Sequence, residues 1–397
     1  MPIKTVEDIN LEGKRVIIRC DFNVPLDENL DITDEKRIVA SLPTIRYVRD
    51  RGVKLILMSH LGRPKGKRIP KMSLAPVAES LSRHLGTAVT LAPDCVGPEV
   101  EKLASSMNVG DVMLLENLRF HKGETENDPG YAEKLASLAD IYVNDAFGAA
   151  HRAHASNEGI THFMETVACG FLLKKEIDYL DNAVKNPKRP FVAIIGGVKI
   201  SGKIDVLTTL LDQADILLIG GGMAYTFFKA MGLEIGNSVL EEEKIELAKE
   251  ILKKAETSRC EFILPVDCMI ADRFANDAET AFVDKNSIPA GWESLDIGMK
   301  TRDLFASKIK CAGTVVWNGP MGVFEMAVFD GGTRAVADAL VEATKEGAVT
   351  IIGGGDSAAA ILKFGVEEGM SHISTGGGAS LELLEGKVLP GVAALDR

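Results

Sequence analysis

The stretch 53-VKLILMSHLGRPKGKRIPKMSLAPVAESLSRHLG-86 decides the fold class. It opens with the apolar run 53-VKLILMS-59, continues through a polar turn, and ends in 74-LAPVAESLSRHLG-86, which has helical spacing. A short run rich in Val, Ile and Leu is typical of a strand that is buried on both faces. A glycine after a helical segment is typical of the end of a helix. The stretch therefore predicts a buried strand followed by a helix.

The same alternation recurs along the chain. The other strand-like runs of the first half are 15-RVIIRC-20, 112-VMLLE-116 and 141-IYVN-144. Those of the second half are 191-FVAII-195, 215-DILLI-219, 261-EFILPV-266, 313-GTVVWN-318 and 349-VTII-352. Strands that alternate with helices form parallel sheets covered by helices. We therefore expect an α/β protein with two doubly wound parallel-sheet domains.

The two series of strands meet at 171-FLLKKEIDYLDNAVKNPKRP-190. The apolar residues of its first part suit a helix, which Pro187 and Pro190 then end. We expect this segment to be an interdomain helix and linker that joins a first domain, 1–170, to a second domain, 191–375.

Composition and charge exclude several classes of protein. The net charge of −12 on 397 residues argues against nucleic acid as the main partner. No run approaches the roughly 20 apolar residues of a membrane helix. The first residues, MPIKTVEDINLEGKR, lack the apolar core of a signal peptide. Six scattered cysteines without a C-x-x-C motif suggest free, mostly buried thiols, so we expect a cytoplasmic protein.

Charged and amide residues follow the strands of the first half. They lie in 19-RCDFNVP-25, 59-SHLGRPKGKR-68, 116-ENLRFHKGE-124 and 144-NDAFGAAHRAH-154. Ligands of open α/β sheets bind outside the carboxyl ends of the strands. Arginine gives planar, bidentate recognition of carboxylate and phosphate, although a single arginine is more often part of a surface ion pair. Several arginines at neighbouring strand ends predict a pocket for a small anion.

Glycines follow the strands of the second half. They lie in 195-IGGVK-199, 219-IGGGM-223, 317-WNGPMG-322 and 352-IGGGDS-357. Glycine lets the backbone come close to a flat or phosphorylated ligand. We expect the second domain to bind such a ligand.

The segment 196-GGVKISGKI-204 contains the pattern G-x-x-x-x-G-K, but it does not complete a P-loop. A P-loop needs a Ser or Thr hydroxyl for Mg²⁺ where this chain has Ile204. Lys199 and Lys203 lie four residues apart instead. The residues alone leave open how this segment would hold a phosphate group.

Two further glycine-rich segments admit more than one interpretation. The segment 353-GGGDSAAA-360 fits a weak dinucleotide fingerprint, but no acidic residue about 20 positions further on could hold a ribose. Asp356 at a phosphate-facing helix start suits Mg²⁺, and it or Ser357 could also cap the helix. The three glycines of 374-STGGGASLELLEG-386 could bind an anion at a helix N-terminus or form a plain turn.

Taken together, these segments resemble the phosphoglycerate kinase family from about Val16 to the C-terminus. The most specific motifs are RCDFNVP (19–25), SHLGRP (59–64), SLAPVAESL (73–81), LLENLRF (114–120), NDAFGAAHRAHAS (144–156), WNGPMGVFE (317–325) and GGGDS (353–357). The resemblance implies reversible transfer of the γ-phosphoryl group of ATP to the carboxylate of 3-phosphoglycerate. It also implies two small-molecule substrates, Mg²⁺ with ATP or ADP, a monomer, and domain closure during the reaction.

The resemblance also implies roles for particular residues. The residues implied for 3-phosphoglycerate are Asp21, Asn23, Arg37, His60, Arg63, Arg119 and Arg152. Those implied for the nucleotide are Lys203, Gly298, Asn318, Pro320, Val323, Glu325, Gly354, Gly355, Asp356 and Ser357, with Asp356 on the metal. Those implied for catalysis are Arg37, Lys199, Gly376 and Gly377. The family also implies that the segment 376–397 returns to the first domain.

The chain departs from the common family pattern at Val198, Gly202 and Met299. The changes at Val198 and Met299 remove no charged group. Two other functions stay open from the residues alone. An NAD-dependent dehydrogenase of the same fold class lacks support because the ribose-binding acid is missing. A two-domain anion-binding protein without catalysis would bind the same ligands but turn over no ATP.

Overall fold

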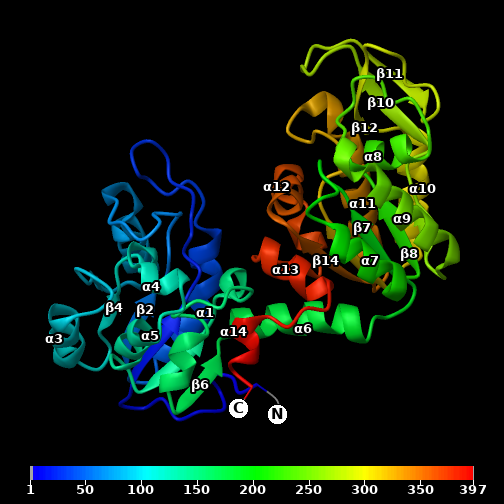
Figure 1. The fold of residues 1–397 in the computed structure, drawn as a ribbon. Helices are drawn as coiled ribbons and strands as arrows, with labels where there is room; N and C mark the ends of the chain where they lie inside the picture. The colour runs from blue at the N-terminus through cyan, green and yellow to red at the C-terminus, as the bar shows by residue number, and fades with distance from the viewer. Residues whose placement is uncertain (1–2, 397) are drawn as a thin grey trace. The chain divides into compact units, whose positions relative to one another are not determined.

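The computed structural model describes residues 3–396. Contacts divide the chain into two compact units. The first unit runs to Asp178 and takes in the segment from Val388, and the second unit spans Tyr179–Lys387. Each unit has a six-stranded sheet of its own, so the predicted fold class of two parallel-sheet units is confirmed (Figure 1).

The first unit is built on a parallel sheet in the order β3-β4-β2-β1-β5-β6. Its strands are β1 (Arg15–Arg19), β2 (Lys54–Met58), β3 (Val89–Leu91), β4 (Val112–Leu114), β5 (Ile141–Asn144) and β6 (Thr166–Cys169). Val16 of β1 lies opposite Leu55 of β2 on one side and Ile141 of β5 on the other. The chain builds the sheet first on the β2 side and later on the β5 side. The strand order therefore reverses between β1 and β5.

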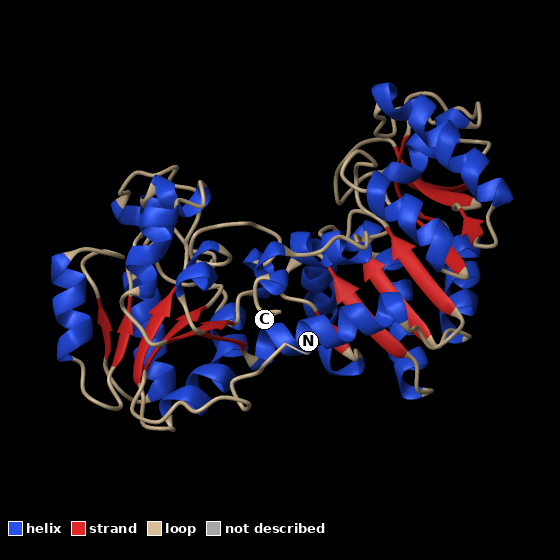
Figure 2. Ribbon diagram, turned by 60° about the horizontal axis from the view of Figure 1, so that its bottom comes forward, coloured by secondary structure: helices blue, strands red, loops and turns tan. Residues whose placement is uncertain are grey.

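Alternate residues of these strands face two layers of helices, which Figure 2 shows on both faces of the sheet. Val16 and Ile18 of β1 pack with Ile38 and Ile45 of α1 in one buried cluster. The α-helices of the first unit are α1 (Lys36–Arg49), α2 (Ala75–Leu85), α3 (Pro98–Ser106), α4 (Lys122–Thr125), α5 (Pro129–Ala136) and α14 (Pro390–Ala393). Its short 3₁₀ helices are η1 (Pro70–Met72), η2 (Leu118–Phe120), η3 (Phe147–Ala149) and η4 (Gly159–Phe163).

The second unit has a parallel sheet in the order β15-β14-β13-β7-β8-β9, which reverses between β7 and β13. Its strands are β7 (Phe191–Ile195), β8 (Ile216–Ile219), β9 (Glu261–Ile263), β13 (Thr314–Asn318), β14 (Val349–Gly353) and β15 (His372–Ile373). Trp317 of β13 is fully buried and belongs to a cluster with Phe305 and Leu340 of the covering helices.

Eight α-helices belong to the second unit in whole or in part. They are α6 (Phe171–Lys185), α7 (Ile204–Gln213), α8 (Met223–Ala230), α9 (Ile245–Thr257), α10 (Met299–Lys310), α11 (Gly331–Lys345), α12 (Gly355–Phe364) and α13 (Gly377–Leu384). Its short 3₁₀ helices are η5 (Glu242–Lys244), η6 (Ala327–Phe329) and η7 (Glu367–Gly369). Among the described residues, no helix combines the length and the apolar character that crossing a membrane needs.

All nine strand-like runs named from the sequence form strands, but the structure has strands that were not predicted. An antiparallel sheet in the order β11-β10-β12 consists of β10 (Asp267–Ala271), β11 (Thr280–Asp284) and β12 (Glu293–Ile297). Its β11 is largely exposed, so it lacks the continuous apolar run that marks a buried parallel strand. The outer strands β3, β6 and β15 are only two to four residues long.

The C-terminal segment differs from its prediction. The sequence analysis placed the whole of 376–397 on the first domain, whereas the contacts place it there only from Val388 onward. Helix α13 instead contacts α7 and β14 of the second unit, because its apolar residues complete that core. Lys387 pairs with Asp205 of α7 at 2.9 Å. Gly391 then accepts a hydrogen bond from the Asn144 side chain of the first unit.

The start of α6 is attached to the first unit by a buried carboxyl group. The Leu173 N–H donates to Oδ1 of Asp145 at 3.1 Å, and the Phe171 N–H donates to the Thr44 hydroxyl at 2.9 Å. Burial raises the pKa of Asp145 to about 7, because these few hydrogen bonds do not replace the water that a carboxylate loses. Asp145 is therefore largely protonated in the folded protein below neutral pH.

We predict that Asp145→Asn makes unfolding less dependent on pH. An unfolded Asp has a pKa of about 3.9, so between about pH 4 and 7 the folded state keeps a proton that the unfolded chain releases. The stability from this group is full below pH 4 and is lost as the pH rises through 7. The unfolding free energy of the variant minus that of wild type should therefore rise by up to about 4 kcal/mol across this range.

Calorimetric unfolding at several pH values measures this difference. Asp140→Asn is the control of opposite sign, because Arg15 holds the pKa of Asp140 below its usual value against a raising effect of burial. For Asp140→Asn, the unfolding free energy of the variant minus that of wild type should fall as the pH rises through the acid range. A difference for Asp145→Asn that stays constant from pH 4 to 8 would contradict the prediction.

Candidate active site

The point where the first sheet reverses carries a buried carboxylate with a cation beside it. Asp21 follows β1 and forms an ion pair with Arg37 at the start of α1. Burial alone would raise the pKa of Asp21, but Arg37, His60 and Arg19 outweigh that effect and hold the pKa below its usual value. Asp21 is therefore ionised at neutral pH and fixes the direction in which the Arg37 guanidinium points.

Gly148 of η3 leaves room for this ion pair. A Cβ at this position would lie 2.3 Å from Oδ2 of Asp21 and 3.6 Å from the nearest guanidinium nitrogen of Arg37. Any other residue at position 148 would displace the carboxylate. The close approach of η3, rather than an unusual backbone angle, is therefore the reason for glycine here.

A second buried arginine lies behind these residues. Arg19 of β1 is fully buried, and Nη2 of its guanidinium donates to Nδ1 of His60 at 3.1 Å. Burial lowers the pKa of His60 well below its usual value, and the guanidiniums of Arg19, Arg119 and Arg37 lower it further, against the opposing charge of Asp21. His60 is therefore a neutral ring in a cationic surrounding.

Asn23 and Arg119 lie at either side of the loop after β2. Oδ1 of Asn23 accepts from the Gly62 N–H at 2.8 Å, and the Arg119 side chain donates to the Gly62 carbonyl at 2.9 Å. Nε of Arg119 is buried and has no hydrogen-bond partner among the described residues. A buried N–H without a partner is costly, so this donor is suited to a ligand oxygen.

Arg63 and Arg152 are exposed, and neither side chain makes a hydrogen bond or ion pair within residues 3–396. The charge of Arg63 helps lower the pKa of Arg119, after burial and Arg19. The charge of Arg152 helps lower the pKa of His154 to about 4, after burial, Arg119 and Arg19. Both guanidiniums therefore lie near the buried cations, with their donors available.

In the second unit, Lys203 lies at the point where the sheet reverses. Its Nζ donates to the Gly196 carbonyl at 2.5 Å and to Oδ1 of Asn318 at 3.1 Å. Gly196 directly follows the central strand β7, and Asn318 is the last residue of the central strand β13. Burial lowers the pKa of Lys203 to about 8, and the charge of Asp356 opposes this shift. No carboxylate pairs with this ammonium among the described residues, so it is suited to a phosphate.

Asn318 lies between Lys203 and the glycines of the β14–α12 turn. Nδ2 of Asn318 is buried without a partner among the described residues. A Cβ on Gly354, which has φ +88°, would lie 3.0 Å from this nitrogen. Ser357 accepts from the Gly319 N–H at 2.6 Å, so its hydroxyl joins the turn after β13 to α12.

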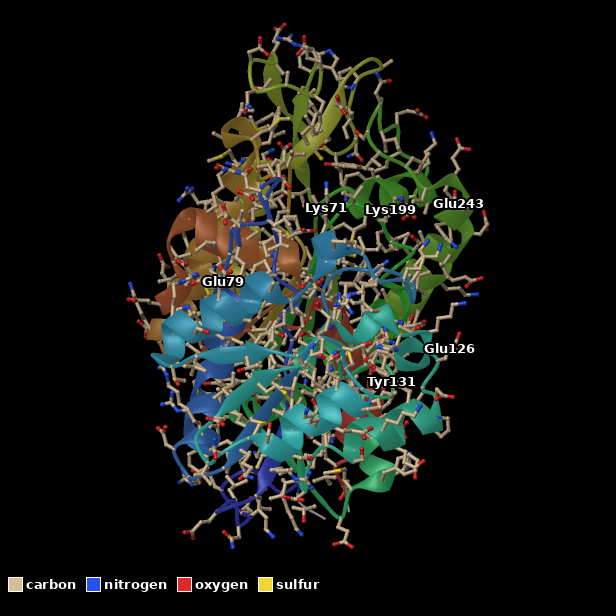
Figure 3. The ribbon with its side chains drawn as sticks, turned by 90° about the vertical axis from the view of Figure 1, so that its left-hand side faces the viewer. Lys71, Glu79, Glu126, Tyr131, Lys199 and Glu243 are labelled. Carbon is tan, nitrogen blue, oxygen red and sulfur yellow. The ribbon has the colours of Figure 1, made fainter. Side chains whose placement is uncertain are left out.

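Asp356 and Lys199 are exposed groups near these turns. Asp356 lies in the first turn of α12, and its carboxylate makes no ion pair in the described part of the chain. Lys199 lies on the loop after β7, and its side chain is labelled in Figure 3. The charge of Lys199 contributes to lowering the pKa of Glu241, after effects of burial and of hydrogen bonds from Ser201 and Ile200.

The N-termini of α12 and α13 lie next to each other. A Cβ on Gly377 would lie 3.5 Å from Cα of Gly354, and Figure 1 shows the two helices side by side. Gly376 is the N-cap of α13, and its carbonyl accepts from the Ser380 N–H at 2.7 Å. Two helix N-termini at one place give a concentration of N–H groups that favours an anion.

The remaining residues assigned to the nucleotide differ in their contacts and in their burial. Gly298 is the N-cap of α10, and a Cβ there would lie 2.2 Å from the Asp267 carboxyl carbon. The Pro320 carbonyl accepts from the Gly197 N–H at 2.8 Å. Val323 is half-buried, and Glu325 is exposed. At the three departures from the family pattern, Val198 and Met299 are exposed side chains, and Gly202 has open space around it.

One group of potential metal ligands lies apart from the residues described above. Asp94, Cys95 and His121 place one donor atom each within 4.8 Å of one another, the one such group found among the described residues. His121 already pairs with Asp94 at 2.6 Å, and the Cys95 thiol donates to the Glu116 carbonyl. We interpret the group as a structural contact between the loop after β3 and the start of α4.

Sequence reasoning missed Arg19 and Gly148. It also missed Ser156, which accepts a hydrogen bond from Nε of Arg19 at 2.9 Å, and Glu124, which accepts one from the Ser156 hydroxyl at 2.7 Å. The available signal for Arg19 was a charged residue inside the apolar run 15-RVIIRC-20. No comparable signal marked the other three, because their importance depends on which loops approach the end of β1.

Comparisons with known proteins identify the family of this chain. The family model described as "Phosphoglycerate kinase" matches residues 6–387. The chain is 58% identical over 396 residues to the phosphoglycerate kinase of Prosthecochloris aestuarii, with 100% of both chains covered. It is 57% identical to the chloroplastic phosphoglycerate kinase 1 of Arabidopsis thaliana, covering 100% of this chain and 83% of the relative. The solved phosphoglycerate kinase of Coxiella burnetii is 41% identical, with a TM-score of 0.90 over 99% of each chain.

We predict that Gly148→Ala destabilises the first unit. The new methyl group must displace the Asp21 carboxylate from Arg37, and overpacking of this kind costs about 1–3 kcal/mol. Gly130→Ala in α5 is the matched control, because its Cβ has room and alanine favours a helix over glycine by about 0.5–1 kcal/mol. Thermal unfolding should show a lower midpoint for the first variant and an unchanged or higher one for the second. Equal midpoints for Gly148→Ala and wild type would contradict the argument.

Proposed function

The chain belongs to the phosphoglycerate kinase family, and from this membership we propose how its two clusters divide the reaction. The family transfers a phosphoryl group reversibly between ATP and the carboxylate of 3-phosphoglycerate. In our proposal the arginine cluster of the first unit, which is built around Asp21, Arg37 and Arg119, binds 3-phosphoglycerate. The lysine and glycine cluster of the second unit binds the nucleotide. The dehydrogenase and the non-catalytic alternative are not favoured, given this membership.

One observation carries the proposal. Each parallel sheet has cationic side chains at the place where its strand order reverses, which is where such sheets bind ligands. In the first unit these groups are Arg37 and Arg119, with the neutral His60 ring beside them and the exposed Arg63 and Arg152 nearby. The residues assigned to 3-phosphoglycerate also include Asp21 and Asn23, which orient Arg37 and the loop after β2.

The nucleotide-binding residues of the proposal surround the end of β7 and β13. Lys203 and the unpartnered amide of Asn318 would contact phosphate oxygens, and the glycines at 354 and 355 would let the chain approach them. Gly298, Pro320, Val323 and Glu325 would line the nucleoside part. These assignments are supported by the free donors at the strand ends and by the family motifs WNGPMGVFE and GGGDS.

The reaction needs no general base, because the acceptor carboxylate is already ionised at neutral pH. The barrier comes from bringing two polyanions into line and from the charge on the moving phosphoryl group. We propose that Arg37 and Lys199 neutralise that charge, together with the N–H groups at Gly376 and Gly377. The two ligands must meet for transfer, so the mechanism requires domain closure, which would also exclude water from the phosphoryl group.

Asp356 is suited to hold Mg²⁺ together with the phosphates. Its carboxylate is exposed and unpaired among the described residues, and it lies beside the helix N-terminus where the phosphates would bind. Mg²⁺ is commonly held by one or two carboxylates plus phosphate oxygens, so the donor set fits. When bound, Mg²⁺ would neutralise phosphate charge. Ser357 does not compete for the metal, since its hydroxyl accepts from Gly319.

We also propose that the chain works as a monomer in the cytoplasm. Both clusters belong to the same chain, so a second copy is not needed to complete either of them. All six cysteines are free, and five of them are buried, as a reducing compartment allows. Cys311 is the exposed one of the six.

We predict that Arg119→Ala and Lys203→Ala affect different substrates. Arg119→Ala removes a free donor of the first unit, so the KM for 3-phosphoglycerate should rise about 10-fold or more while nucleotide affinity stays within a few-fold. Lys203→Ala should weaken Mg-ATP binding and leave 3-phosphoglycerate binding intact. Coupled kinetics and calorimetric titration of each ligand measure both effects. Reversed effects of the two variants would mean that the substrates are assigned to the wrong units.

We predict that Lys199→Ala lowers kcat by about 10²–10³-fold, the scale of one preorganised charge-stabilising donor. A contact made mainly in the transition state leaves ground-state affinity nearly unchanged, so Mg-ATP affinity should stay within a few-fold of wild type. Lys249→Ala, which removes an equally charged exposed lysine of α9, is the control and should change neither quantity. If Lys199→Ala keeps kcat and raises only the nucleotide KM, Lys199 binds the ground state and is not catalytic.

A further inference from the structure

We propose that Glu124 and Ser156 are positioning residues that act on His60 through the buried Arg19. In this proposal they hold the guanidinium so that the His60 ring keeps its proton on Nε2 and presents it to the acceptor substrate. The inference rests on the proposed function, because His60 is assigned there to 3-phosphoglycerate. It adds two residues that lie behind the site and contact no proposed ligand.

The contacts form a continuous chain of hydrogen bonds. The Ser156 hydroxyl donates to Oε1 of Glu124 at 2.7 Å, and the Ser156 N–H donates to Oε2 at 3.0 Å. The same hydroxyl accepts from Nε of Arg19 at 2.9 Å. Arg19, Ser156 and Glu124 are all fully buried. Water therefore does not replace any of these three side chains as a hydrogen-bond partner.

The chemistry of the groups fixes the direction of every bond. Arginine has only donors, and an ionised carboxylate has only acceptors. A serine hydroxyl has one proton, so if Ser156 gives it to Glu124, a lone pair is left for Arg19. Nη2 of Arg19 must in turn donate to Nδ1 of His60, at 3.1 Å. Nδ1 then has no proton, and the neutral ring carries its proton on Nε2.

Charge explains why this chain of hydrogen bonds ends in the carboxylate of Glu124. Arg19 is buried, and no carboxylate oxygen lies within ion-pair distance of its guanidinium in the described part of the chain. A buried guanidinium needs a counter-charge and filled hydrogen bonds. Glu124 supplies the charge across one hydroxyl. His154 lies 3.7 Å from Glu124, but burial and nearby arginines lower the pKa of His154 to about 4, so it brings no competing charge at neutral pH.

The groups around His60 also oppose a second proton on the ring. A proton on Nδ1 would face the Arg19 guanidinium, and Arg119 and Arg37 add further positive charge. The charge of Asp21 favours the charged ring, but burial and the three guanidiniums outweigh it. His60 therefore stays neutral while Arg19 is held against it. Without the Ser156 hydroxyl, the guanidinium loses the bond at Nε and is held by the Cys20 carbonyl on another nitrogen, so it can turn and Nδ1 can gain a proton.

Nitrogen-15 NMR of the ligand-free protein, with histidine labelled in the ring, tests the tautomer directly. In wild type, the His60 signals should show an unprotonated Nδ1 and a protonated Nε2 from pH 5.5 to 8. Ser156→Ala should give a mixture of tautomers or a titration within this range. It should also raise the KM for 3-phosphoglycerate about 5- to 10-fold, with the KM for Mg-ATP unchanged.

Ser80→Ala is the matched control, because Ser80 is equally buried and donates to Glu35 at 2.6 Å, away from Arg19. It should change neither the His60 signals nor the KM. A protonated Nδ1 in wild type overturns the proposal, and so does a His60 signal that Ser156→Ala leaves unchanged. Because the wild-type spectrum needs no variant, poor folding of Ser156→Ala does not remove the test.

A separate measurement distinguishes failure of the proposed function. Addition of 3-phosphoglycerate to wild type should shift the His60 resonances. If the tautomer is as expected and the resonances do not move, the assignment of this site to 3-phosphoglycerate fails, while the arrangement of Glu124, Ser156 and Arg19 stands.

Discussion

The structure depends on one constraint, the burial of both faces of each parallel sheet. Side chains of the central strands pack into helix layers, so polar chemistry is confined to the strand ends and to the few buried polar side chains that neighbouring groups can satisfy. Both candidate clusters lie at the carboxyl ends of the strands where the order reverses, between β1 and β5 and between β7 and β13. The positions of the loops that carry Asp21 and Gly196 follow from this arrangement.

Both clusters are proposed to bind anions, and they differ in the cations that they use. A guanidinium keeps its charge under burial, so Arg19 can lie inside the first unit and still act as a cation. An ammonium loses part of its charge preference there, as the lowered pKa of Lys203 shows. The first unit can therefore use buried arginines as fixed elements. The second unit relies more on backbone N–H groups, which need no charge and which glycine exposes.

The sequence predicted well whatever depends on continuous local patterns. Runs such as 191-FVAII-195 formed strands because burial on both faces leaves no polar interruption. It did not predict β10, β11 and β12. The strand β11 is largely exposed, and the buried strands β10 and β12 contain Asp267 and Asp296, which interrupt the apolar run. The segment 376–387 was placed on the wrong unit, because its attachment depends on the apolar face of α13. Gly148 and Glu124 could not be found, since their roles come from loops that meet only in the folded chain.

The position of Lys203 has a consequence for the heat of ligand binding. Its ammonium is held by carbonyl and amide oxygens and has a pKa of about 8, so part of the population is neutral in mildly alkaline solution. In the proposed role, an arriving phosphate stabilises the charged form, and the lysine takes up a proton from solution. That proton comes from the buffer. The observed enthalpy of nucleotide binding then contains the ionisation enthalpy of the buffer, and affinity at alkaline pH is coupled to proton concentration.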